Sequence, residues 1–167
     1  MVALKEWAQR PIEERNLFNP PFLCSLTQEF VREFGKTDAS PIMLVSIALT
    51  ASLHGGTRSN LPYSVVTSLY EWLQDHENLL VEFSSRARNL MPHVREAIVF
   101  GLSYGSFEIR PDGTLGLTSK RALFSKLFLD ETTPETKDII IRTKFMGRWF
   151  SKSGSEASIC AAWGLSP

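Results

Sequence analysis

A G-x-S-x-G string at residues 101–105 is the pattern in this sequence that most resembles a catalytic motif. In a serine hydrolase, Ser103 would be the nucleophile on a sharp turn that joins a strand to a following helix. The residue periodicity here predicts the reverse order, with a helix before the string and a β-hairpin after it. The chain order of the hydrolase motif also places the histidine after the serine. All the histidines of this chain precede it: His54, His76 and His93. A hydrolase using Ser103 is therefore a remote alternative, and we expect no catalytic residue and no enzyme.

The other residues that could bind a metal or cofactor are scattered along the chain. Cys24 and Cys160 lie far apart and share no motif with a histidine, whereas a tetrahedral zinc site needs about four ligands. The sequence has no P-loop lysine and no dinucleotide-binding glycine pattern. Two cysteines are also too few to indicate a secreted disulfide scaffold. We therefore expect no metal, no cofactor and reduced thiols.

A basic stripe follows one side of the helix predicted at residues 136–152. At 100° per residue its cations fall within an arc of about 80°. They are Lys137, Lys144, Arg148 and Lys152. Asp138 and Arg142 are four residues apart on the apolar side and are expected to form an intrahelical pair. Two interpretations of the stripe remain open: an ordinary solvated surface, or a contact surface for nucleic acid or an acidic protein.

Helix caps, prolines and apolar periodicity define the elements that would position these residues. Asn19 before two prolines predicts a helix that runs through Phe34 and ends at Gly35. The segment 42–53 is apolar on nearly all sides, so it predicts a buried central helix. Further helices are predicted at residues 4–14 (interrupted at Pro11), 64–74, 77–90, 94–102, 120–129 (capped by Ser119) and 156–163.

A β-hairpin is predicted where the period changes from helical to alternating. Residues 106–110 and 114–118 alternate, and a Pro-Asp-Gly turn lies between them. Three helices followed by a hairpin are typical of a winged helix. The predicted fold is mainly α with a small β-hairpin: one domain over residues 1–167, with a winged-helix-like core at about 64–118 and flanking helices in 1–60 and 119–167. In such a fold the third helix would be residues 94–102 and the wing would be the hairpin. The positive and negative charges of each cancel, which favours a protein over DNA as the partner.

Composition excludes several classes of protein. The chain has 18 basic and 18 acidic residues among 167, so its formal net charge is zero and bulk charge cannot drive nucleic-acid binding. At 43% hydrophobic and 22% charged residues it is not a disordered chain. The longest uncharged run, residues 39–57, contains an apolar stretch too short to span a bilayer. We expect a soluble, cytoplasmic protein with no membrane contact.

Two stretches of the sequence carry a family resemblance. They are RPIEERNLFNPPF at residues 10–22 and KFMGRWF at residues 144–150, the latter followed by AAWGLSP at residues 161–167. They resemble the small middle component of bacterial three-component ABC systems, the group that includes Lamassu-type antiphage defence. The resemblance implies a non-enzymatic adaptor with winged-helix character. It would couple an SMC-like ABC ATPase that senses DNA to an effector, often a nuclease, and would reach DNA only as part of that complex.

An adaptor needs residues that contact its partners, and tryptophan and arginine dominate interface energetics. Trp7, Trp149 and Trp163 are therefore candidates, although core packing is the commoner role of a tryptophan. The predicted partner-binding set comprises Trp7, Arg10, Lys144, Arg148, Trp149, Lys152 and Trp163. The alternative to an adaptor is a free-standing winged-helix DNA-binding protein, whose isolated chain would bind duplex DNA in a salt-dependent way.

Overall fold

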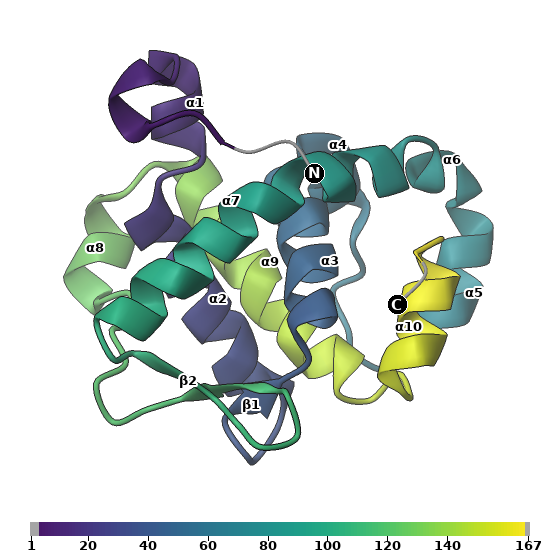
Figure 1. Ribbon diagram of the computed structural model, residues 1–167. Helices are drawn as coiled ribbons and strands as arrows, with labels where there is room; N and C mark the ends of the chain where they lie inside the picture. The colour runs from purple at the N-terminus through teal and green to yellow at the C-terminus, as the bar shows by residue number, and fades with distance from the viewer. Residues whose placement is uncertain (1–3, 166–167) are drawn as a thin grey trace.

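The computed structural model describes residues 4–165 and shows a mainly α-helical fold with a small antiparallel sheet, which confirms the predicted class (Figure 1). None of the described helices is long and apolar enough to cross a membrane. The helices are η1 Trp7–Gln9, α1 Ile12–Leu17, α2 Pro20–Phe34, α3 Ile42–Leu53, α4 Gly55–Asn60, α5 Leu69–Asp75, α6 Glu77–Leu80, α7 Phe83–Ser103, α8 Lys126–Glu131, α9 Pro134–Phe150 and α10 Glu156–Ala162. The strands are β1 Ala39–Ser40, β2 Phe107–Ile109 and β3 Leu115–Leu117.

Helices α2 and α3 form where their sequence signals predict them. The Asn19 side chain accepts a hydrogen bond from the Phe22 backbone N–H at 3.2 Å, and the two prolines fill the first helical positions, where no backbone donor is needed. Helix α2 ends before Gly35, as expected. In α3, residues from Leu44 to Ser52 are buried without a break, which confirms the predicted central helix.

Helices α9 and α2 cross in close contact within the core. A Cβ atom on Gly147 would lie 2.7 Å from the carbonyl oxygen of Phe30 and 2.9 Å from the Cβ of Glu33. Glycine therefore lets α9 lie directly against the backbone of α2. Helix α3 packs against both α2 and α9, and α7 packs against α2 and α3 to complete the core.

Two buried polar residues of α2 explain why the helix predicted at residues 120–129 is wrong. The Gln28 side-chain oxygen accepts a hydrogen bond from the Ala122 backbone N–H at 2.7 Å, and Glu29 accepts one from Phe124 at 3.3 Å. These bonds use backbone donors that a helix would otherwise use. A helix begins only at Lys126, after Ser125 rather than Ser119, because the Ser125 hydroxyl caps it.

Other predicted boundaries are also corrected by tertiary packing. Helix α7 runs continuously through Pro92, where two separate helices were predicted. An internal proline costs about 3 kcal/mol, but Leu90 and Val94 are buried on either side of it, so packing outweighs that cost. Helix α5 begins only at Leu69, and around Pro11 the first predicted helix becomes η1 and α1.

The predicted hairpin is confirmed, and a third strand joins it. Strands β2 and β3 pair with Phe107 opposite Leu117, and β3 also pairs with β1, giving the order β1-β3-β2. No periodicity predicts β1, because two residues are too few to alternate. The sheet lies along one edge of the helical core (Figure 1). The division into a core at residues 64–118 and flanking helices stays a prediction.

The α2–α9 contact leads to a stability prediction. Gly147→Ala should lower the free energy of unfolding by about 1–3 kcal/mol, because the added methyl group collides with the α2 backbone. Alanine is otherwise the better helix former by about 1 kcal/mol, so a gain in stability in urea unfolding would contradict the close approach. Gly35→Ala is the matched control, since no atom lies within 4 Å of its added Cβ, and it should change the free energy by less than about 0.5 kcal/mol.

Candidate functional site

The G-x-S-x-G string does not form a nucleophile elbow. Ser103 is the last residue of α7, and its hydroxyl donates a hydrogen bond to the Val99 carbonyl at 2.8 Å. Gly105 follows with a φ of +72°, a left-handed turn that leads the chain into β2. The order of helix, turn and hairpin is therefore the predicted one, and it is not the strand-turn-helix context in which a hydrolase serine acts.

No group of three His, Cys, Asp or Glu side chains within residues 4–165 is arranged to hold a metal ion. Cys24 and Cys160 are both free and buried. Burial raises the pKa of each thiol, so neither has the lowered pKa of a reactive cysteine.

The basic stripe of α9 is partly neutralised within the chain. Arg148 donates a hydrogen bond to Glu33 at 3.0 Å, and the Lys144 ammonium lies 3.6 Å from the buried carboxylate of Glu29. Both carboxylates come from α2, so these ion pairs follow from the close α2–α9 crossing. Lys152 is exposed just beyond the end of α9. The stripe therefore presents Lys137, Arg148 and Lys152 to solvent, with Lys144 half-buried.

The predicted Asp138–Arg142 pair is confirmed, at 3.9 Å between Arg142 Nε and the carboxylate. Asp138 also has a closer partner that the sequence analysis missed. Arg58 of α4 is buried, and its Nε donates to Asp138 at 2.8 Å while another nitrogen donates to Glu135 at 3.0 Å. This network fixes the start of α9 against the end of α3. The residues are about 80 positions apart, so no local pattern could have indicated it.

Two of the predicted partner-binding tryptophans lie in the core. Trp149 and Trp163 are each 1% exposed, and the Trp149 indole N–H donates to the Thr67 carbonyl at 2.7 Å. Both pack close to Trp72, with ring centroids 5.5 Å and 6.0 Å away. Burial removes Trp149 and Trp163 from the surface that a partner can reach in this fold.

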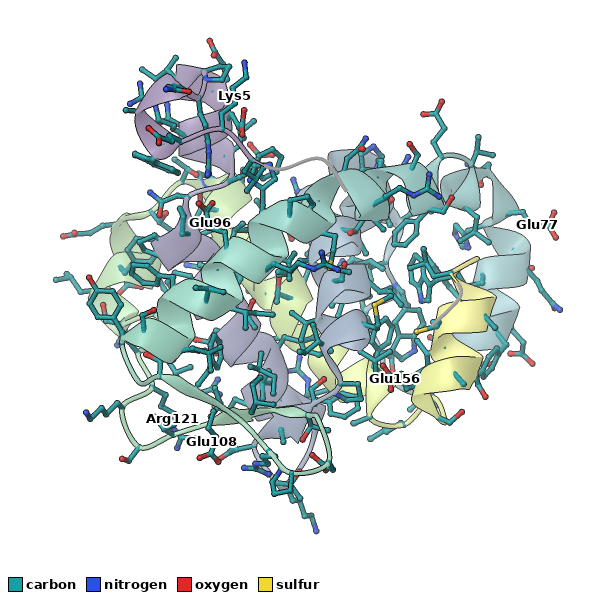
Figure 2. The ribbon with its side chains drawn as sticks, in the orientation of Figure 1. Lys5, Glu77, Glu96, Glu108, Arg121 and Glu156 are labelled. Carbon is teal, nitrogen blue, oxygen red and sulfur yellow. The ribbon has the colours of Figure 1, made fainter. Side chains whose placement is uncertain are left out.

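The N-terminal arm, residues 4–17, carries the remaining two candidates. Figure 1 shows α1 projecting from the rest of the molecule, and none of its residues is buried. Trp7 is 39% exposed, whereas Arg10 is buried and donates two hydrogen bonds to Glu96 of α7 at 2.6 and 2.7 Å. In Figure 2 Glu96 lies on α7 below the arm. The carboxylate raises the pKa of Arg10, so the arm is held by a permanent ion pair.

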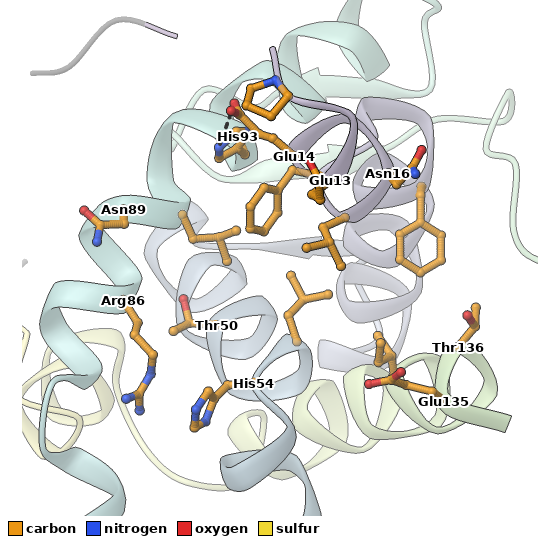
Figure 3. Close-up of a pocket in the computed structure, with 17 residues that line it drawn as sticks. Glu13, Glu14, Asn16, Thr50, His54, Arg86, Asn89, His93, Glu135 and Thr136 are labelled. Atoms are coloured by element: carbon orange, nitrogen blue, oxygen red, sulfur yellow. Dashed lines mark ion pairs between the residues drawn. The ribbon is translucent and has the colours of Figure 1, made fainter. Parts of the chain in front are cut away.

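A cavity of about 880 Å³ opens beside the arm, and Figure 3 shows its lining. Its walls come from α1, the start of α2, the end of α3, α7 and the start of α9. The volume lies within the range of about 300–1,000 Å³ found for binding pockets. Its apolar surface includes Leu17, Phe18, Phe22, Leu53, Leu90 and Ile139.

His93 is the buried polar residue of this cavity wall. Its ring stacks on Phe18 at 4.4 Å between centroids, and its Nε2 lies 3.8 Å from a Glu14 carboxylate oxygen, the contact dashed in Figure 3. Its Nδ1 is buried without a hydrogen-bond partner among residues 4–165. Burial lowers the pKa of His93 and Arg10 lowers it further, although Glu14 and Glu96 oppose the shift. The imidazole is therefore neutral at neutral pH.

His54 and Arg86 lie near each other at another side of the cavity (Figure 3). The His54 Nδ1 accepts a hydrogen bond from the Thr57 backbone N–H at 3.1 Å and so caps α4. Burial lowers the pKa of His54, and the neighbouring cation of Arg86 lowers it further. The Arg86 guanidinium donates to the carbonyls of Leu79 and Val81 at 3.1 and 3.2 Å, so its position is fixed.

The buried histidine gives a prediction for pH dependence. The free energy of unfolding should fall as the pH drops below about 6.5, because the unfolded chain then binds a proton that the buried His93 imidazole resists. His93→Gln should lose less stability than the wild type between pH about 7.5 and about 5.5 in urea unfolding. Since His54 contributes a shift of the same sign, part of the loss should remain. Parallel pH profiles for the two proteins would contradict the burial of a neutral His93.

Comparison with known proteins agrees with the resemblance seen in the sequence. The family described as ABC-three component (ABC-3C) system Middle Component 3 matches residues 7–167. No curated protein and no solved structure shows significant similarity to the chain. The match spans nearly the whole sequence, including residues 7–17 of the arm, the cavity lining and α9. The chain therefore belongs to the Middle Component 3 family of ABC-three component systems.

Proposed function

We propose that this protein is a non-enzymatic adaptor that couples an SMC-like ABC ATPase, which senses DNA, to an effector in Lamassu-type antiphage defence. The observation that carries the proposal is the family match over residues 7–167, because a middle component belongs to a system with further components. The identity of the partners and the antiphage role come from the resemblance of residues 10–22 and 144–150.

Surface features support a role in binding other proteins. The arm exposes three large apolar side chains, with Trp7 at 39%, Ile12 at 59% and Leu17 at 62% of their full exposure. Apolar side chains that gather on a small projecting segment are typical of interaction sites. Arg148 lies in the last turn of α9 and Lys152 lies just beyond it, and both offer positive charge to an acidic surface. An adaptor needs two such separate surfaces.

We also propose that the winged-helix character belongs to a larger part of the chain than residues 64–118. In this proposal α2, α3 and α7 would be the three helices and the sheet would be the wing. These helices pack together, and β1, between α2 and α3, pairs with the hairpin. Its third helix is a poor DNA reader. Glu96 on α7 is bound by Arg10, and in the wing Arg110 lies 3.5 Å from Glu108. These pairings favour a protein partner over the alternative of a free-standing DNA-binding protein.

The charge at the end of α9 can be tested in the assembled system. The double variant Arg148→Glu, Lys152→Glu should fold, lose the Glu33 ion pair at a cost of about 0–1 kcal/mol, and fail to co-purify with another component of its three-component system. The wild-type complex should also dissociate as salt rises, because screening weakens charge pairs.

Lys120→Glu with Lys126→Glu is the matched control, since both lysines are exposed, lie outside α9 and change the net charge equally. Wild-type assembly by the α9 variant, or an equal loss of co-purification in the control, would show that the basic stripe is an ordinary solvated surface.

Ser103 provides the test of the enzyme alternative. Ser103→Ala should leave defence against phage unchanged, because the hydroxyl only donates to Val99 in its own helix. Thermal unfolding would confirm that the variant is folded. Loss of defence by a folded variant, together with labelling of the wild type by a serine-directed phosphonate, would support a serine hydrolase that uses Ser103.

A further inference from the structure

The cavity beside the N-terminal arm has the composition of a protein-binding groove. Its apolar surface comes from five separate elements, with Phe18, Phe22 and Leu90 among its side chains. Apolar surface that stays open in a folded chain loses the stabilisation that burial gives. Removing this surface from water therefore favours any partner that supplies apolar side chains of matching shape.

The charged residues of the cavity wall indicate which charge such a partner should carry. Three carboxylates line the cavity: Glu13 and Glu14 on α1, and Glu135 on α9. Glu135 is already ion-paired with Arg58 at 3.0 Å. Among the described lining residues Arg86 also carries a positive charge, which its bonds to two backbone carbonyls leave in place, so the acidic rim is the one that α1 forms. The carboxylates lie on different sides of the apolar surface, as Figure 3 shows. A cationic partner would therefore meet its acceptors on the α1 rim, where Glu13 and Glu14 lie.

Two further features show how the cavity wall could respond to an occupant. The Nδ1 atom of His93 is buried in the wall without a partner among the described residues, although native proteins pair nearly all such atoms. The wall formed by α1 has no buried residue, so it can adjust its position around the ion pair between Arg10 and Glu96. A site with an unpaired polar atom and one adaptable wall is suited to closing around a segment of another chain.

We propose that this cavity is the docking site for an amphipathic helical segment of another component of the system, with apolar side chains on one face and at least one lysine or arginine. The proposal deepens the adaptor function and rests on it. The apolar side chains enter between Phe18, Leu53 and Leu90, and the cation meets Glu13 or Glu14 at the rim. Recognition of this kind uses anchors spaced by three or four residues along a helix.

Filling the cavity tests the docking site in the co-expressed system. Asn89 is exposed and lines the cavity, whereas its neighbour Arg88 is exposed and does not. Asn89→Trp should reduce recovery of one partner component by at least about tenfold, and Arg88→Trp should leave recovery within about twofold. Glu13→Lys should act like Asn89→Trp, with Glu131→Lys on α8 as its control.

The outcomes separate the two proposals. If the wild type recovers no other component, the adaptor function fails. If the wild type assembles and both cavity variants assemble equally well, the adaptor function stands and the docking site is wrong. A photo-crosslinker at position 89 should join a partner segment that contains apolar residues and a lysine or arginine, and one at position 88 should not. A crosslink from position 89 to an acidic segment would contradict the proposed charge.

A second measurement on the isolated chain tests the site without the other components. A designed amphipathic peptide of leucine and lysine should bind at least about tenfold more tightly than its leucine and glutamate counterpart. Binding should shift the NMR signals of the His93 imidazole and the Phe18 ring. Equal affinity for the two peptides, or shifts that leave His93 and Phe18 unchanged, would overturn the inference.

Discussion

The direct contact between α9 and the backbone of α2 is the constraint on which the rest of the structure depends. Because Gly147 has no side chain, the two helices approach closely enough for Glu29 and Glu33 of α2 to meet the cations of α9. The same buried Glu29 also accepts a hydrogen bond from the segment before α8. One close helix crossing therefore neutralises part of the basic stripe. The same glutamate holds the segment before α8 against α2.

That crossing also places the two surfaces of the proposed adaptor. The first turns of α9 line the cavity with Glu135, and the end of the helix carries Arg148, followed by Lys152. A 17-residue helix is about 25 Å long, so it holds the cavity and the basic patch at a fixed separation. Two partners of opposite charge bound at these ends would be coupled through one rigid element.

The sequence predicts those elements whose signals are local. Asn19 with its prolines defines the start of α2, and the alternation around residues 111–113 defines the hairpin, because caps, turns and periodicity act over a few residues. It fails where distant residues decide the structure. Gln28 is 94 positions from Ala122, and Arg10 is 86 positions from Glu96, so neither the irregular segment before α8 nor the anchoring of the arm could be read from spacing. The cavity was missed for the same reason, since five elements build it.

Hydrogen exchange in the assembled complex tests the central claim most directly, because α1 forms one wall of the cavity and has no buried residue of its own. The account predicts that the amides of residues 12–17 exchange rapidly in the isolated chain and become protected when the other components bind. Unchanged rapid exchange at residues 12–17 in a complex that protects other surfaces would contradict it.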